Sequence, residues 1–150
     1  LDALVIDMPP GTGDVALSLC QLVKVDCALV VSTPQEVALL DARKGIALFR
    51  KTDIPIGGLV LNMSHFVSPD TGAKYELFGK SDAFDKLAAR LSVPVLGRVP
   101  LEPRVSEMGD DGQPVALQLA LKSGSADLPE TAKEFGSIAE QIWAILKQNK

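Results

Sequence analysis

Short apolar runs alternate with segments of helical periodicity along most of the chain. Four runs rich in Val, Ile and Leu are nearly continuous, which is typical of strands covered on both faces in a parallel sheet. We therefore predict an α/β fold, doubly wound, with a mostly parallel sheet and helices on both faces. The expected strands are Ala3–Asp7, Cys27–Ser32, Ile56–Asn62 and Val95–Val99. The expected helices are Asp14–Val23, Gln35–Lys51, Ser81–Leu91, Arg104–Met108 and a final helix near the end of the chain.

Two helices carry additional local signals. Thr33, followed by Pro34 and by Glu36 three residues after Thr33, predicts a capping box with Thr33 as the N-cap. On the final helix, apolar residues recur at spacings of three and four and predict one apolar face made of Phe135, Ile138, Ile142 and Ile145.

Two stretches interrupt the alternation of strands and helices. Residues 63–81 show no clear period, and loops of this length inside a compact domain are often functional. Within them, the run from Ser68 to Gly72 predicts a β-turn, with Pro69 at its second position. Residues 110–128 are polar and rich in small residues in their second half, which predicts a mobile connection.

The first expected strand ends in Asp7, and a tight Pro-Pro-Gly-Thr-Gly turn follows. A carboxylate at the carboxyl end of a buried strand is where P-loop proteins hold the magnesium of a nucleoside triphosphate. We expect Asp7 to hold a magnesium-bound water and Gly11 to present its backbone N–H to the terminal phosphate. The chain contains no G-x-x-x-x-G-K-[ST] loop, so the main phosphate-binding element lies outside it.

The same turn also fits a rival interpretation. Gly11-x-Gly13-x-x-Ala16, between a strand and a helix, matches the dinucleotide-binding fingerprint. That fingerprint requires an acidic residue at the end of the next strand, where this chain has Ser32 followed by Thr33. The triphosphate interpretation is therefore preferred.

Two residues at strand ends suggest a base-binding region. Asn62 ends the third expected strand, and an amide can donate to and accept from a purine edge at once. The loop that begins at Pro100 follows the neighbouring strand and should flank the same base. Asp41, on the second helix, is either a switch-linked or interface residue or a solvated charge. His65 is the only histidine and has no cysteine partners, so it is a weak metal candidate.

Composition limits the partners. The chain has 150 residues and a net charge of −4, and its lysines and arginines form no basic stripe, so we expect no nucleic-acid partner. Apolar runs are far shorter than the roughly 18 residues that span a bilayer, so we expect no membrane attachment.

Cys20 and Cys27 lack a metal or redox spacing and suit an intracellular, reducing compartment. The start at Leu1, directly before a core strand, leads us to expect an N-terminally incomplete domain.

The motifs along the chain resemble those of the Mrp/Nbp-type P-loop ATPases, which are MinD-related iron–sulfur cluster carrier and assembly proteins. The stretches that carry the resemblance are Asp7–Asp14, Thr33–Lys44, Gly58–Phe66, Phe78-Gly79 and Val93–Leu101. Under this resemblance, residues 1–150 are the C-terminal portion of a single P-loop NTPase domain, located in the cytoplasm or the mitochondrial matrix.

The resemblance implies roles for individual residues. Asp7 becomes the magnesium-side Walker B aspartate, and Gly11 lies in the second switch. Asn62 contacts adenine, and the loop of Val99, Pro100 and Leu101 flanks the base. ATP and magnesium are the implied cofactors, within a homodimer or with a complementary N-terminal half.

One departure from the family pattern concerns the cluster. The family carries Cys-Pro-x-Cys in the long loop, whose thiolates bind a [4Fe–4S] cluster, whereas this chain has Ser68 and Thr71 at those positions. Hydroxyls stay protonated at neutral pH and are poor ligands for cluster iron. We therefore expect no cluster ligands on this loop.

Three functions follow from these observations. The first is ATP-dependent transfer of [4Fe–4S] clusters to client apoproteins by the full-length protein. The second is a degenerate, non-enzymatic interaction module. The third is a MinD/ParA-like positioning ATPase, which is disfavoured because the final helix lacks a strongly basic face.

Overall fold

The computed structural model describes residues 1–9, 11, 13–117 and 128–148. Its centre is a parallel sheet of three strands, β1 (Ala28–Ser32), β2 (Ile56–Leu61) and β5 (Val95–Arg98), in the order β1-β2-β5. Each strand lies within one residue of the range expected from its apolar run. The prediction of parallel pairing is confirmed.

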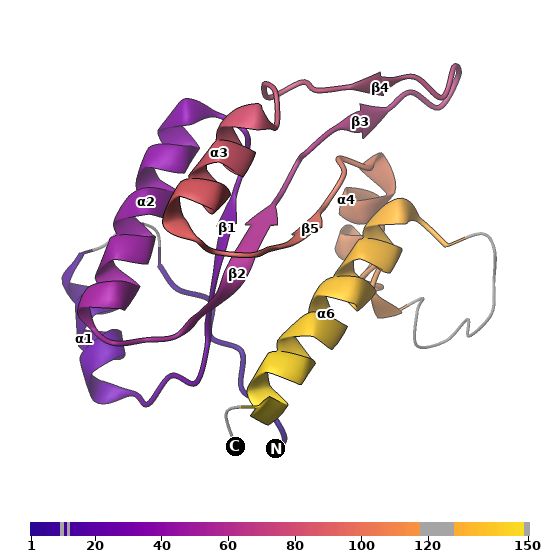
Figure 1. Ribbon diagram of the computed structural model, residues 1–150. Coiled ribbons are helices and arrows are strands. Elements are labelled where there is room, and N and C mark those ends of the chain that lie inside the picture. The colour runs from indigo at the N-terminus through magenta and orange to yellow at the C-terminus, as the bar shows by residue number, and fades with distance from the viewer. Residues whose placement is uncertain (10, 12, 118–127, 149–150) are drawn as a thin grey trace.

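Helices cover both faces of this sheet (Figure 1). The helices α2 (Glu36–Lys51) and α3 (Asp82–Leu91) pack on one face, and α6 (Glu130–Gln148) packs on the other, mainly against β5. The remaining described helices are α1 (Asp14–Leu22) and α4 (Pro103–Asp110). The doubly wound α/β architecture predicted from the sequence is therefore confirmed.

Two apolar clusters explain why the strand sequences are continuously hydrophobic. Leu59 and Leu61 of β2 are buried with Phe84 of α3 on the face that α2 and α3 cover. Val60, between them in the sequence, points to the opposite face and packs in the cluster that contains Ile138 of α6. Successive side chains of a strand alternate in direction, so two covered faces require an apolar residue at every position.

The prediction of a strand at Ala3–Asp7 is wrong for this structure. Residues 1–9 form no regular element, and the side chains of Leu4 and Val5 are 73% and 92% exposed. A strand is stabilised by hydrogen bonds to its neighbours and by cover on its faces. Within the described part of the chain, no strand pairs with residues 1–9, so the local apolar pattern alone does not produce one.

The expected capping box at Thr33 is also wrong. Gln35 has an extended backbone and is the N-cap residue of α2, so the helix begins at Glu36. The hydroxyl of Thr33 donates to the side-chain oxygen of Gln35 at 3.4 Å instead of accepting a backbone N–H. The predicted N-cap therefore lies two residues before the observed one.

The unpatterned stretch 63–81 contains an antiparallel hairpin of β3 (Phe66–Val67) and β4 (Lys74–Tyr75), drawn at the top right of Figure 1. The chain turns at the predicted place, but the Gly72 N–H donates to the Ser68 carbonyl at 2.9 Å, so the tip is a five-residue α-turn and not the predicted β-turn. Gly72 has a φ of +68°, a conformation that glycine adopts without a steric penalty.

Two further predictions concern the last third of the chain. The predicted mobile connection 110–128 falls largely on residues 118–127, which lie outside the described residues. On the apolar face predicted for α6, Ile138 is buried, whereas Phe135 is 39% exposed. In the described portion, no helix combines the length and apolarity needed to cross a membrane.

Candidate nucleotide site

Two loops lie side by side at the carboxyl edge of the sheet. One begins at Asn62, directly after β2, and the other comprises Val99, Pro100 and Leu101, directly after β5. The Val99 N–H donates to the Leu61 carbonyl at 2.8 Å, and the Leu101 N–H donates to the His65 carbonyl at 2.7 Å. The structure thus brings together the residues that the sequence analysis assigned to base binding. This edge is where open parallel α/β sheets hold ligands.

Ser64 connects these two loops through hydrogen bonds. Its hydroxyl and its backbone N–H both donate to the Val99 carbonyl, each at 3.0 Å, and the residue is only 3% exposed. Its hydroxyl also lies 3.1 Å from Nδ1 of His65. The sequence analysis did not identify Ser64, because a serine beyond a strand carries no local signal for a partner 35 residues away.

The side chain of Asn62 is held in place but keeps free hydrogen-bonding groups. Its Oδ1 accepts the backbone N–H of Met63 at 3.0 Å, and Met63 has a φ of +53°. Its own backbone N–H donates to the Ser32 carbonyl at 2.7 Å, which continues the pairing of β1 with β2. No described residue accepts a hydrogen bond from Nδ2. The amide can therefore donate through Nδ2 and accept through the second lone pair of Oδ1.

The residues predicted for the phosphate end lie elsewhere. Asp7 is exposed and makes no hydrogen bond or ion pair with any described residue. Gly11, with a φ of +87°, lines a shallow cavity of about 170 Å³ together with Asp41, Lys44 and Gly45 of α2. The structure therefore groups Gly11 with Asp41, and it places neither residue in a common cavity with Asn62.

Ser68 and Thr71 lie at the tip of the hairpin. The hydroxyl of Thr71 accepts the backbone N–H of Ala73 at 3.3 Å, so it takes part in the turn. Among the residues that the structure describes, no group of three or more His, Cys, Asp or Glu side chains is placed to hold a metal ion. Cys20 is buried against Ala28 and Ile54 in a separate apolar cluster.

The second cysteine has an altered acidity. Partial burial raises the pKa of the Cys27 thiol above its ordinary value of 9.0; a backbone hydrogen bond from Gly57 opposes the shift, and the Asp26 carboxylate adds to it. A thiol with a raised pKa is a weak nucleophile and a weak metal ligand at neutral pH. Both cysteines are free; Cys20 is buried and Cys27 is half-buried.

Charged groups join the base of the hairpin to the start of α6. Glu130 lies 3.4 Å from Nζ of Lys74 on β4 and 3.6 Å from Nε2 of His65. The two carboxylate oxygens of Glu102 accept the backbone N–H groups of Glu130 and Thr131 at 3.2 and 3.3 Å. The sequence analysis missed these contacts, which connect residues far apart in the chain.

Comparisons with known proteins identify the family of the chain. A family model described as the NUBPL iron-transfer P-loop NTPase matches residues 1–143. The mouse iron–sulfur cluster transfer protein NUBPL is 46% identical over 149 residues, which cover 99% of this chain and 44% of that protein. An iron–sulfur cluster carrier protein from Deinococcus radiodurans is 50% identical over 117 residues, covering 78% of this chain and 33% of the relative. The chain thus spans less than half the length of these relatives.

Solved structures show the same fold. A nucleotide-binding protein from Archaeoglobus fulgidus, in complex with ADP, superposes with a TM-score of 0.67 at 35% identity, covering 75% of this chain and 46% of that one. The MinD cell division protein of Aquifex aeolicus superposes with a TM-score of 0.55 at 18% identity, covering 79% and 44%, a likeness of fold alone. Together with the parallel sheet and its two covered faces, these matches show that the chain belongs to the NUBPL iron-transfer P-loop NTPase family.

Proposed function

We propose that the protein binds an adenine nucleotide and uses it in the delivery of iron–sulfur clusters to recipient apoproteins. The observation that carries this proposal is the side-chain amide of Asn62, whose Nδ2 has no acceptor among the described residues. This amide lies beside the loop of Val99, Pro100 and Leu101 at the carboxyl edge of the sheet. The names of the relatives, which describe cluster carriers and a cluster transfer protein, support the delivery role.

The amide of Asn62 suits an adenine edge. Nδ2 would donate to a ring nitrogen while Oδ1 accepts from the exocyclic amine, a two-bond pairing that asparagine makes with adenine. Pro100 and Leu101 would supply apolar contact with the flat base. Ser64 holds this loop against the loop of Asn62, so the two halves of the base site keep their separation.

Asp7 and Gly11 are the proposed residues for the phosphate end. Asp7 offers a free carboxylate, and carboxylate oxygens and water are the ligands that Mg²⁺ prefers. Magnesium would neutralise charge on the phosphates. Gly11 has its N–H on an exposed, left-handed turn, a backbone position from which it can donate to a phosphate oxygen.

The binding of nucleotide is tested on the natural full-length protein with a fluorescent ADP analogue. We expect Asn62→Ala to weaken binding by about tenfold or more and to abolish any preference for adenine over guanine. Gln113→Ala, which removes an exposed amide outside the loops of Asn62 and Pro100, is the matched control and should bind normally. Equal affinity of the wild type and Asn62→Ala would contradict the proposed base site.

The cluster is cargo in this proposal, and the hairpin tip does not hold it. Anaerobic reconstitution of the wild type with iron and sulfide should give no stoichiometric cluster absorbance, because Ser68 and Thr71 offer only hydroxyls. The double variant Ser68→Cys, Thr71→Cys should gain that absorbance. A stable cluster on the wild type would refute this part of the proposal.

We also propose that two copies associate through the outer side of α2. Val37 and Leu40 expose 66% and 50% of their surface beside the cavity of Gly11 and Asp41. Adjoining exposed apolar side chains with a polar rim are a feature of protein interfaces. Light scattering with and without ATP should show a dimer that Leu40→Asp weakens, and a monomer under all conditions would contradict it.

A further inference from the structure

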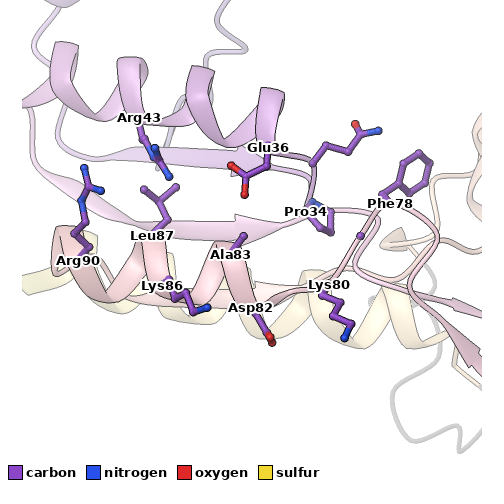
Figure 2. Close-up of a pocket in the computed structure, with 12 residues that line it drawn as sticks. Pro34, Glu36, Arg43, Phe78, Lys80, Asp82, Ala83, Lys86, Leu87 and Arg90 are labelled. Atoms are coloured by element: carbon purple, nitrogen blue, oxygen red, sulfur yellow. The ribbon is translucent and has the colours of Figure 1, made fainter.

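A second cavity lies between α2 and α3, apart from the residues proposed for nucleotide binding. Its volume is about 600 Å³, within the range of small-molecule sites. Pro34 and Phe78 line one end of it, and Arg43 and Arg90 line the other (Figure 2). Two family motifs separated by more than thirty residues, Thr33–Lys44 and Phe78-Gly79, thus meet at one cavity that the proposed nucleotide site does not use.

The cavity concentrates positive charge in an acidic protein. Two arginines and two lysines line it, Arg43, Lys80, Lys86 and Arg90, against only two carboxylates, Glu36 and Asp82. The lining therefore has an excess of two positive charges, although the whole chain has a net charge of −4. None of the four cations forms an ion pair with a described residue.

Arg43 has a buried hydrogen-bond donor that a ligand could satisfy. Its Nε atom is buried, and it has no hydrogen-bond partner among the described residues. A buried donor without a partner is costly, and a ligand that accepts its hydrogen bond removes that cost. In Figure 2 the side chains of Arg43 on α2 and Arg90 on α3 extend toward each other across the space beside Leu87.

The geometry points to a phosphate group between these two arginines. Guanidinium groups bind phosphate through paired N–H donors, and they do so better than point charges such as lysine. A phosphate monoester carries about −1.5 to −2 charges at neutral pH, which matches the excess of two positive charges in the lining. We propose that the cavity binds a small organic phosphate monoester, whose organic part lies toward Pro34 and Ala83 and whose phosphate contacts Arg43 and Arg90.

The test measures binding of glycerol 3-phosphate and inorganic phosphate to the natural full-length protein by calorimetry at constant ionic strength. We expect saturable binding of both probes, weakened about tenfold or more by Arg43→Gln and by Arg90→Gln. Arg90 is exposed, so its variant keeps the test valid if Arg43→Gln disturbs folding. Arg104→Gln removes an exposed arginine on α4, outside the cavity, and should leave binding unchanged.

Four outcomes would overturn the proposal. The first is the absence of saturable binding of both phosphate probes. The second is an equal loss in Arg104→Gln, which would show non-specific attraction. The third is equally tight binding of succinate, a dicarboxylate, which would remove the preference for phosphate. The fourth is loss of glycerol 3-phosphate binding when the protein is saturated with ADP, which would place the phosphate in the nucleotide site.

Discussion

Gly97 of β5 lies directly against Ile138 of α6, with no room for a side chain between them. A Cβ atom at position 97 would lie 2.6 Å from Cγ1 and 2.7 Å from Cδ1 of Ile138. One residue before Gly97, the Leu96 carbonyl accepts a hydrogen bond from Nε2 of Gln141 at 2.7 Å. This close approach attaches α6 to the edge strand and covers the second face of the sheet.

The substitution Gly97→Ala should therefore destabilise the protein. The new methyl group must displace Ile138 or shift α6, and overpacking of this kind costs about 1–3 kcal/mol in the free energy of unfolding. Urea denaturation measures the change. The control is Gly45→Ala within α2, where an added Cβ would meet nothing within 4 Å, and which should stabilise the helix by about 0.5–1 kcal/mol. Unaltered stability of Gly97→Ala would show that α6 is not packed as described.

A second prediction concerns the start of α6. Both carboxylate oxygens of Glu102 accept backbone N–H groups there, from Glu130 and Thr131, and negative charge is favourable at a helix N-terminus. Glu102→Gln removes the charge and one acceptor, and should lower the free energy of unfolding by about 0.5–2 kcal/mol. Glu107→Gln, an exposed change on α4, is the control and should be nearly neutral. Similar melting temperatures for both variants would contradict this capping role.

The parts of the fold that could be predicted are those determined by the residue pattern of a single segment. The ranges of β1, β2 and β5 were predicted within one residue, because strands covered on both faces must be apolar at every position. The α3 and α4 helices were expected at Ser81–Leu91 and Arg104–Met108 and lie at Asp82–Leu91 and Pro103–Asp110. Residues 3–7 show the limit of this argument, since a suitable local pattern forms no strand where no neighbouring strand pairs with it.

The contacts that the sequence analysis missed join residues that are far apart in the chain. Ser64 contacts a carbonyl 35 residues away, and Glu102 contacts N–H groups at positions 130 and 131. Many serines and glutamates in the chain have the same local surroundings, so only the three-dimensional fold selects these two. The place of Asn62 beside the loop of Pro100 was predictable because its position at a strand end is itself a local signal, and its role in base binding stays a prediction.

Ser64 gives the third prediction. Its hydroxyl bonds the Val99 carbonyl in a buried position, so Ser64→Ala should lower the free energy of unfolding by about 1 kcal/mol. The loss also loosens the contact between the loops of Asn62 and Pro100, so nucleotide binding should weaken more than stability alone explains. Fluorescent ADP titration, compared at a temperature where all variants are folded, measures this. Ser106→Ala, an exposed change on α4, is the control, and equal nucleotide affinity in both variants would refute the role of Ser64.

The last prediction concerns the pH dependence of stability, through Cys27. Partial burial raises the pKa of this thiol in the folded protein above its ordinary value of 9.0, with Gly57 opposing and Asp26 adding to the shift. Above pH 9.0 the unfolded chain loses its thiol proton first, so unfolding releases a proton, and the thiol's contribution to stability falls as the pH rises through the folded pKa. Below pH 9.0 both states keep the proton and the contribution is fully present. Urea denaturation between about pH 8 and about pH 10 should therefore show a steeper loss of stability for the wild type than for Cys27→Ala. Parallel curves for the two proteins would mean that the thiol is as readily ionised in the folded chain as in the unfolded one.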